Sequence, residues 1–195
     1  IPALTRKFFK EAILIEPEKL NFRILMINIY LNELEKSVTS HNIALTDENN
    51  SQRRLVLNEV RNFGDHRIAN GPIEHETLNE KNISVVKGET LDKIAPNLKR
   101  ENSLIFMDAQ GHEGFILRGA KQNIKKKIPI VLEFTPRWIK ENGSYDYFKL
   151  LLGYSFVYDL SEAKPTPIEF NEVVLKNLFE KYIQSENLYT DLLFV

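Results

Sequence analysis

One short segment, residues 108–113, holds most of the residues that can do chemistry. It contains Asp108, Gln110, Gly111, His112 and Glu113, directly after a short apolar run. A carboxylate or an imidazole can remove a proton from a reacting group, and histidine suits this task because its unperturbed pKa lies near neutrality. The same residues also suit the start of a helix, which Asp108 or Gln110 would cap. The segment therefore predicts either a catalytic cluster or a capped helix.

Three further acidic residues each follow an apolar run: Glu16, Asp47 and Glu133. Open α/β sheets bind ligands beyond the carboxyl ends of their strands. A carboxylate at Glu16 can accept hydrogen bonds from both hydroxyls of a ribose, or it can favour the N-terminus of a helix that starts at Pro17. Asp47 is either a ligand of an adenine amine or an ordinary turn residue. Glu133 is a candidate to accept a hydrogen bond from a hydroxyl group of a substrate.

Other kinds of chemistry find less support. The chain has no cysteine, which excludes disulfides, thiolate metal sites and a cysteine nucleophile. Asp108, His112 and Glu133 are able to converge on a cation, but no zinc-type spacing is present, so we expect no metal. No phosphate loop, serine nucleophile elbow or kinase signature occurs either.

The elements that must position these residues alternate along the chain. Short apolar runs predict strands, and apolar residues at three- and four-residue spacing predict helices. Such alternation is typical of an α/β fold with a mainly parallel sheet. The strands are expected over residues 12–15, 38–45, 54–57, 83–86, 104–107, 129–134, 156–158 and 192–195. The helices are expected over residues 3–10, 17–34, 90–95, 115–124, 147–152 and 174–182.

Two details of this pattern can be checked. In the second helix, the spacing predicts one buried face made of Leu20, Ile24, Ile27, Leu31 and Leu34. In the middle of the chain, residues 61–82 are polar and rich in turn signals. We therefore expect one domain over residues 1–195, with residues 53–87 forming a hairpin-like excursion from its sheet.

The composition is that of an ordinary globular protein. The 195 residues are 43% hydrophobic and 27% charged, with a formal net charge of −1. This charge creates no overall field that would attract nucleic acid or an anionic membrane. No apolar run approaches the roughly 20 residues that span a bilayer. The absence of cysteine suits a reducing compartment, so the expected location is cytoplasmic.

Several segments together resemble the FkbM-type methyltransferases. The most specific part runs from Asp108 to Ala120, and the likeness extends over nearly the whole chain. The segments that carry it are Ile-Leu-Ile-Glu-Pro-Glu at 13–18 with Asn21-Phe22 and Asn28, Asn-Phe-Gly-Asp-His-Arg-Ile at 62–68, Thr-Leu-Asp at 90–92, Met-Asp-Ala-Gln-Gly-His-Glu at 107–113, Leu-Arg-Gly-Ala at 117–120 and Val-Leu-Glu at 131–133.

This resemblance implies a Rossmann-like class I methyltransferase fold, with a mostly parallel sheet whose last strand is antiparallel. It implies S-adenosylmethionine as cofactor and, as acceptor, a hydroxyl of a sugar or small metabolite. Glu16, Asp47 and Gln110 are then expected to bind the cofactor, and Asp108, His112 and Glu133 to serve catalysis. The glycine-rich first motif of the family is expected before Ile1, so we expect an N-terminally truncated domain whose first strand is missing.

Two alternatives remain open. One is a catalytically silent binding or scaffold module that keeps the same fold. The other is a sugar-nucleotide enzyme, which is disfavoured because the acid at Glu16 lacks an upstream glycine fingerprint and because no Tyr-x-x-x-Lys dyad is expected.

Overall fold

The computed structural model describes residues 2–58, 64, 66–69, 82–184 and 189–195. By its internal contacts the chain divides into two compact units, which are described separately. The first unit comprises Ile1–Leu45 and Asn50–Glu89, and the second comprises Thr46–Asn49 and Thr90–Val195. Whether the two units form one domain, as expected above, stays a prediction. Residues 59–63, 65 and 70–81 of the predicted excursion, including Asn62, Phe63 and Asp65, lie outside the described residues.

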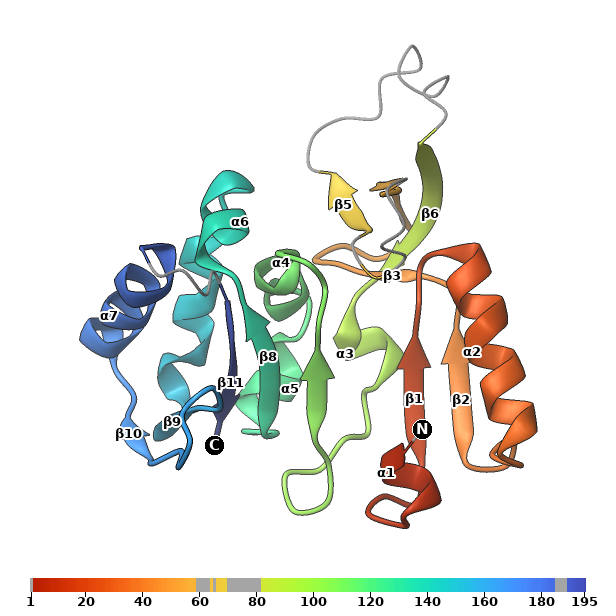
Figure 1. The fold of residues 1–195 in the computed structure, drawn as a ribbon, viewed down its shortest axis with the longest axis horizontal. Coiled ribbons are helices and arrows are strands. Elements are labelled where there is room, and N and C mark those ends of the chain that lie inside the picture. The colour runs from red at the N-terminus through yellow and green to blue at the C-terminus, as the bar shows by residue number, and fades with distance from the viewer. Residues whose placement is uncertain (1, 59–63, 65, 70–81, 185–188) are drawn as a thin grey trace. The chain divides into compact units, whose positions relative to one another are not determined.

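The first unit contains a parallel pair of strands joined by a helix. Strand β1 (Ala12–Ile15) pairs in parallel with β2 (Val38–His41), and α2 (Lys19–Leu31) connects them (Figure 1). A short helix, α1 (Pro2–Thr5), precedes β1. The predicted helix over residues 3–10 is thus reduced to one turn. Helix α2 begins two residues after Pro17, because the side chain of Glu18 caps it by accepting a hydrogen bond from the Asn21 N–H at 2.6 Å.

The predicted buried face of α2 is wrong. Leu20, Ile24, Ile27 and Leu31 are 49%, 49%, 56% and 76% exposed, whereas Ile29 is 2% exposed. The small core of this unit consists of Leu4, Ile29 and Leu34, packed against Ala12, Leu14, Leu25, Met26 and Val38. The spacing misled because α2 carries apolar residues on nearly every side, so that periodicity alone does not select one face.

A second, four-stranded sheet completes the first unit. Its strand order is β3-β6-β4-β5, with β3 parallel to β6 and β4 antiparallel to both β6 and β5. The bounds are β3 (Ala44–Leu45), β4 (Ser51–Val56), β5 (Arg67–Ala69) and β6 (Ile83–Glu89). The single strand predicted over residues 38–45 is therefore two strands in different sheets. The break between them includes Asn42. The side-chain Nδ2 of Asn42 donates hydrogen bonds to the carbonyl oxygens of Glu16 and Pro17.

The second unit is built on a five-stranded mixed sheet of order β10-β9-β11-β8-β7. β7 and β8 are parallel, and β11 lies antiparallel between β8 and β9. Helices flank this sheet (Figure 1). The strands are β7 (Ile105–Met107), β8 (Ile130–Phe134), β9 (Phe156–Asp159), β10 (Ile168–Glu169) and β11 (Thr190–Phe194). The helices are α3 (Leu91–Ile94), α4 (Glu113–Arg118), α5 (Lys121–Lys125), α6 (Pro136–Glu141), the 3₁₀ helix η2 (Tyr145–Gly153) and α7 (Glu172–Ile183).

The fold is α/β, as predicted, but its sheets are mixed. Among the described strands, three pairings are parallel and five are antiparallel. The expectation of a mostly parallel sheet is therefore not confirmed, because β4, β5, β10 and β11 each add antiparallel pairings. The antiparallel last strand is confirmed: β11 opposes both of its neighbours.

The helix predicted over residues 115–124 is two short helices that meet at Gly119. A Cβ at this position would lie 2.1 Å from the carbonyl oxygen of Thr46, so only glycine allows this approach. The second helix, α5, is capped from outside: the carboxylate of Asp92 accepts hydrogen bonds from the N–H groups of Gln122 and Asn123 at 2.8 and 3.0 Å. In the part of the chain that is described, no helix is long and apolar enough to cross a membrane.

Candidate active site

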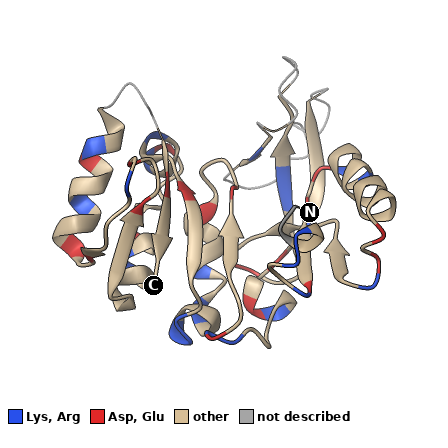
Figure 2. Cartoon of the chain, turned by 60° about the horizontal axis from the view of Figure 1, so that its bottom comes forward, with Lys and Arg blue, Asp and Glu red and all other residues tan. Residues whose placement is uncertain are grey.

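Three acidic residues gather at one edge of the sheet in the second unit. Because β7 and β8 are parallel, Asp108, which follows β7, and Glu133, near the end of β8, come to the same edge. β11 runs the other way and pairs its residue Asp191 with Glu133. In Figure 2 acidic positions on neighbouring strands gather at one end of this sheet. Burial and the nearby charge of Asp108 raise the pKa of Asp191, which agrees with this proximity.

Gln110 connects two of these carboxylates. Its Nε2 donates to Oδ1 of Asp108 at 2.8 Å and approaches Oε2 of Glu133 at 3.4 Å. The same Glu133 oxygen accepts from the hydroxyl of Thr135 at 3.3 Å. Asp108 is exposed and Glu133 is half-buried, so this cluster is accessible at the edge where α/β sheets bind ligands.

A tight turn presents Gln110 to this cluster. The His112 N–H donates to the carbonyl of Ala109 at 3.1 Å, and the two residues between them have positive φ, 50° at Gln110 and 90° at Gly111. A left-handed conformation is costly for glutamine and easy for glycine. Gly111 is also needed for space, because a Cβ there would lie 2.6 Å from Cβ of Trp138.

His112, which the resemblance assigns to catalysis, is buried in the structure. Its side chain is 3% exposed, and its ring stacks on Phe115 with centroids 4.8 Å apart. His112 is the N-terminal flanking residue of α4, although its side chain makes no capping hydrogen bond. Burial of this kind suits a packing role and hinders contact with a substrate hydroxyl. The structure thus brings Asp108, Gln110 and Glu133 together and turns His112 inward.

Glu113 is the residue of this segment whose importance the sequence did not reveal. Its side chain is fully buried, and Oε1 accepts a hydrogen bond from the Ala109 N–H at 2.7 Å. Burial raises its pKa to about 8, and the carboxylates of Glu133 and Asp108 add to the rise, against hydrogen bonds from the backbone of Glu113 and Ala109. The sequence suggested only a first-turn acid of a helix.

Glu16 lies in the first unit, directly after β1. Its Oε1 accepts from the N–H of Glu18 at 2.7 Å, and among the described residues its Oε2 has no hydrogen-bond partner. Burial raises the pKa of this carboxyl, as does the charge of Glu18, while the Glu18 N–H and His66 lower it. The alternative in which Glu16 supports the start of the helix stays open: Glu18 is the capping residue, and Glu16 accepts the N–H of that residue.

Asp47 lies in the second unit and is engaged by the last turn of α4. Its Oδ2 is 3.4 Å from Nη1 of Arg118, and its Oδ1 accepts from the Thr46 hydroxyl at 3.0 Å. Arg118 also donates to the Tyr147 hydroxyl at 2.6 Å and lies over the Tyr147 ring. A role for Asp47 in binding adenine stays a prediction, and this ion pair is the competing explanation for the residue.

A tyrosine and a lysine that sequence reasoning passed over have the spacing of a reductase dyad. Tyr145 and Lys149 lie four residues apart on η2, but Lys149 pairs with Asp146 and Glu172 at 3.0 and 3.6 Å. The Tyr145 ring packs edge-on against Phe179, and burial raises its pKa, opposite to the lowering that a tyrosine acid–base needs. This pair therefore gives no support to the sugar-nucleotide alternative. Over the described residues, no group of three His, Asp or Glu side chains is arranged to hold a metal ion.

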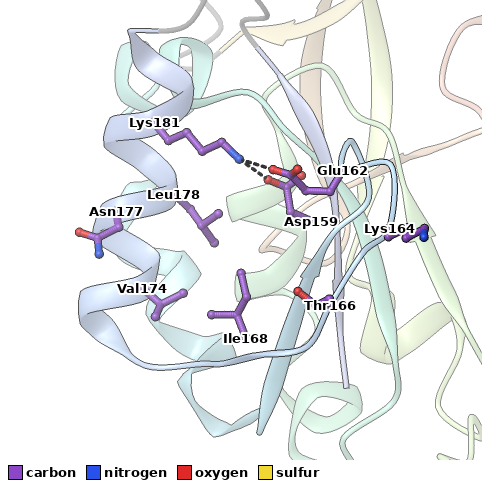
Figure 3. Close-up of a pocket in the computed structure, with 9 residues that line it drawn as sticks. All are labelled: Asp159, Glu162, Lys164, Thr166, Ile168, Val174, Asn177, Leu178 and Lys181. Atoms are coloured by element: carbon purple, nitrogen blue, oxygen red, sulfur yellow. Dashed lines mark hydrogen bonds and ion pairs between the residues drawn. The ribbon is translucent and has the colours of Figure 1, made fainter.

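A pocket of about 370 Å³ lies elsewhere in the second unit, between α7 and the segment that joins β9 to β10 (Figure 3). At its rim, Nζ of Lys181 contacts both Asp159 and Glu162 at 2.9 Å. Asp159 also accepts hydrogen bonds from Thr190 at 2.6 Å and Tyr182 at 2.5 Å, so its carboxylate is committed to holding α7 against the sheet. None of the predicted site residues lines this pocket. Its lining consists of Asp159, Glu162, Lys164, Thr166, Ile168, Val174, Asn177, Leu178 and Lys181.

Residues 3–163 match the family model described as Methyltransferase FkbM domain. The chain belongs to the FkbM methyltransferase family. Every site residue predicted from the sequence lies inside the matched part of this FkbM domain, whereas Asp191 lies beyond it. No protein in the curated comparison matches the chain.

A solved structure agrees with this membership at the level of the fold. The chain is similar to the crystal structure of a methyltransferase FkbM from Methylobacillus flagellatus KT, with a TM-score of 0.53 and 13% sequence identity. The match covers 96% of this chain and 37% of that one, so the FkbM chain described here spans little more than a third of the relative's length.

Proposed function

We propose that this FkbM-family protein is an S-adenosylmethionine-dependent O-methyltransferase that acts on a hydroxyl of a sugar or small metabolite. The observation that carries the proposal is the hydrogen-bonded group of Asp108, Gln110 and Glu133 at the ligand-binding edge of the second unit. An alcohol acceptor has to be oriented and has to lose its proton, and this group offers an amide and two carboxylates for those two tasks.

The chemistry needed from the protein is modest. When bound, S-adenosylmethionine supplies a methyl group already activated by its sulfonium sulfur. Asp108 is the better placed base, since its carboxylate is exposed and held by Gln110. Glu133, fixed by Gln110 and Thr135, is placed to accept a hydrogen bond from the acceptor hydroxyl. His112, being buried, supports the turn rather than the proton transfer.

The residues present fit the ribose end of the cofactor. The half-buried Glu16 carboxylate follows β1, and one of its oxygens is fixed by the Glu18 N–H. Among the described residues its other oxygen has no partner, which leaves it able to accept from a ribose hydroxyl. The structure gives Asp47 a protein partner in Arg118, so its expected contact with adenine requires that ion pair to be shared.

Methyl transfer from labelled S-adenosylmethionine to candidate hydroxyl acceptors tests this function. We expect Asp108→Asn and Glu133→Gln each to lower kcat at least tenfold, since a general base contributes roughly 10²–10⁴-fold. Both changes keep the size of the side chain, so the melting temperature should change little. The exposed Glu180, paired with Lys176 on α7, provides the matched control Glu180→Gln, which should keep full kcat.

The outcomes separate the alternatives. Transfer that survives unchanged in both Asp108→Asn and Glu133→Gln would place the base elsewhere. A protein that transfers no methyl group to any hydroxyl acceptor and does not bind the cofactor would favour a catalytically silent module of the same fold.

A further inference from the structure

The buried carboxyl of Glu113 anchors the turn that carries Gln110. Oε1 of Glu113 accepts the hydrogen bond of the Ala109 N–H at 2.7 Å, four residues back along the chain. Ala109 in turn accepts from the His112 N–H, which closes the turn around Gln110 and Gly111. The Asn142 side chain holds the same turn from outside by donating to the Gly111 carbonyl.

This anchoring matters because the turn is conformationally costly. Gln110 has a φ of 50°, in the left-handed region that residues other than glycine rarely adopt. Such a conformation persists only where its surroundings hold it in place. The conformation is also what places Nε2 of Gln110 within 2.8 Å of Asp108 and 3.4 Å of Glu133.

We propose that Glu113 is the positioning residue of this site, whose buried carboxyl holds the turn at 109–112 so that Gln110 bridges Asp108 and Glu133. This proposal rests on the proposed function in one respect: its effect on kcat can be measured only if the protein transfers methyl groups. The geometry it describes, from the Ala109 N–H to the Gln110 amide, belongs to the second unit alone.

Glu113 does this in its protonated form at neutral pH. Its side chain is completely buried, and among the described residues its Oε2 has no hydrogen-bond partner, an environment that disfavours a charge. The pKa of about 8 given above has the same cause. Ionisation above that pH would strengthen the hydrogen bond from the Ala109 N–H but would add a buried charge beside the carboxylates of Asp108 and Glu133, and we expect the repulsion to prevail and to open the turn.

Other titratable groups lie on the elements that carry Glu113 or pack against it. On the sheet, Asp108 and Glu133 act directly on it, with Asp191 paired to Glu133. On its own segment, His112 precedes it and Arg118 ends the helix. Helix α4 packs against η2 and α5. The titratable residues of η2 are Tyr145, Asp146, Tyr147 and Lys149. Those of α5 are Lys121 and Lys125.

Two substitutions distinguish positioning from mere packing. Glu113→Leu fills the buried place with an apolar side chain of similar size, which cannot accept a hydrogen bond from the Ala109 N–H. Glu113→Gln keeps an oxygen acceptor and imitates the protonated acid. We expect kcat for methyl transfer to fall at least tenfold in Glu113→Leu and to stay within threefold of wild type in Glu113→Gln.

The pH profile is the readout that a purely structural role would not move. In the wild type we expect kcat to fall above a pH of about 8, as Glu113 ionises. In Glu113→Gln this alkaline decline should move upward by at least one pH unit. The proposal is overturned if Glu113→Leu is folded and keeps kcat within twofold, or if Glu113→Gln loses as much activity as Glu113→Leu. An alkaline decline that does not move in Glu113→Gln overturns it equally.

A readout independent of activity keeps this inference separate from the proposed function. In NMR spectra of the wild type, the Ala109 amide proton should titrate with a midpoint of about 8, and in Glu113→Gln it should not. If no methyl transfer is found and this titration is present, the proposed function fails and the positioning role stands. If the Ala109 amide does not titrate in the wild type, the role assigned to Glu113 is wrong whatever the activity.

Discussion

Glu113 and Asp159 are both buried carboxyl groups of the second unit, yet their pKa values shift in opposite directions. Burial alone raises the pKa of either one. For Asp159, hydrogen bonds from Thr190, Tyr182, Lys181 and Ser161 outweigh burial and hold the pKa well below its usual range. Glu113 accepts mainly from backbone N–H groups and faces other carboxylates, so burial prevails. The number and charge of the donors therefore decide which buried acid is ionised.

The ionised state of Asp159 makes a prediction about stability. We expect Asp159→Asn to lower the free energy of unfolding by about 1.5–3 kcal/mol at pH 7, because it weakens the hydrogen bonds that Lys181, Tyr182 and Thr190 donate to a charged carboxylate. Because the folded pKa is lowered, this stabilisation is fully present above the unfolded pKa of roughly 4 and is lost as the pH falls through the folded value. Urea unfolding at several pH values measures the difference.

A matched control uses the other acid that contacts Lys181. Glu162 lies 2.9 Å from Nζ of Lys181, as Asp159 does, but its side chain is 57% exposed. Exposed ion pairs contribute roughly 0–1 kcal/mol, so Glu162→Gln should cost less than about 1 kcal/mol. If the two variants lost the same free energy of unfolding, the buried hydrogen bonds around Asp159 would contribute no more to stability than an exposed ion pair.

At the scale of single residues, the sequence predicted some positions well and others poorly. Of Asp108, His112 and Glu133, which the sequence suggests can converge, the structure brings Asp108 and Glu133 to one sheet edge, because they follow or end neighbouring parallel strands, and buries His112. Asp191 was missed because its position depends on the register of an antiparallel pair, which the sequence does not specify. The buried orientation of His112 follows from the tight turn before it, in which Gln110 has a positive φ. Glutamine rarely adopts this conformation, so the sequence did not predict the turn.

Among the elements, short helices of the second unit depend on caps from other segments. Asp92, in the first turn of α3, accepts hydrogen bonds from the N–H groups of Gln122 and Asn123 and from the Asn123 side chain at 3.0 Å. Since α5 has only five residues, it cannot be stable by its own hydrogen bonds. The Thr-Leu-Asp motif at residues 90–92 thus has a structural purpose: Thr90 caps α3 and Asp92 caps α5.

Removing that cap should destabilise the second unit. We expect Asp92→Ala to lower the free energy of unfolding by roughly 0.5–2 kcal/mol, the usual cost of losing a helix cap. Thermal unfolding followed by circular dichroism measures the loss. Asp146→Ala is the control, because Asp146 is exposed and, in the described part of the chain, its ion pair is with Lys149 on its own helix. A loss no greater than that of the control would mean that Asp92 does not support α5.

Element types were easier to predict than element faces. Four strands of the sheet in the second unit, β7, β8, β9 and β11, were predicted, and so were the buried residues Leu175, Leu178 and Tyr182 of α7. The two-residue strand β10 was missed, because it is too short to show a pattern. The face of α2 failed because apolar residues surround that helix. The short α6 was missed, although Pro136 at its first position is a signal for the start of a helix.

For the whole molecule, the two units divide the expected tasks. The first carries Glu16, proposed to bind the ribose, and the second carries the Asp108 cluster, proposed to act on the acceptor. Membership in the FkbM family rests on the match over residues 3–163, which spans residues of both units. The central claim, that the protein binds S-adenosylmethionine through Glu16, therefore needs a measurement on the full protein.

Calorimetric titration with S-adenosylhomocysteine is the most direct test. We predict that the wild type binds and that Glu16→Gln weakens binding by about 1.5–3 kcal/mol, roughly tenfold or more in Kd, because hydrogen bonds to a charged group are lost. The matched control Glu11→Gln changes an exposed acid just before β1 and should bind as the wild type does. Absence of binding by the wild type, or equal affinities of Glu16→Gln and wild type with an intact fold, would contradict the account.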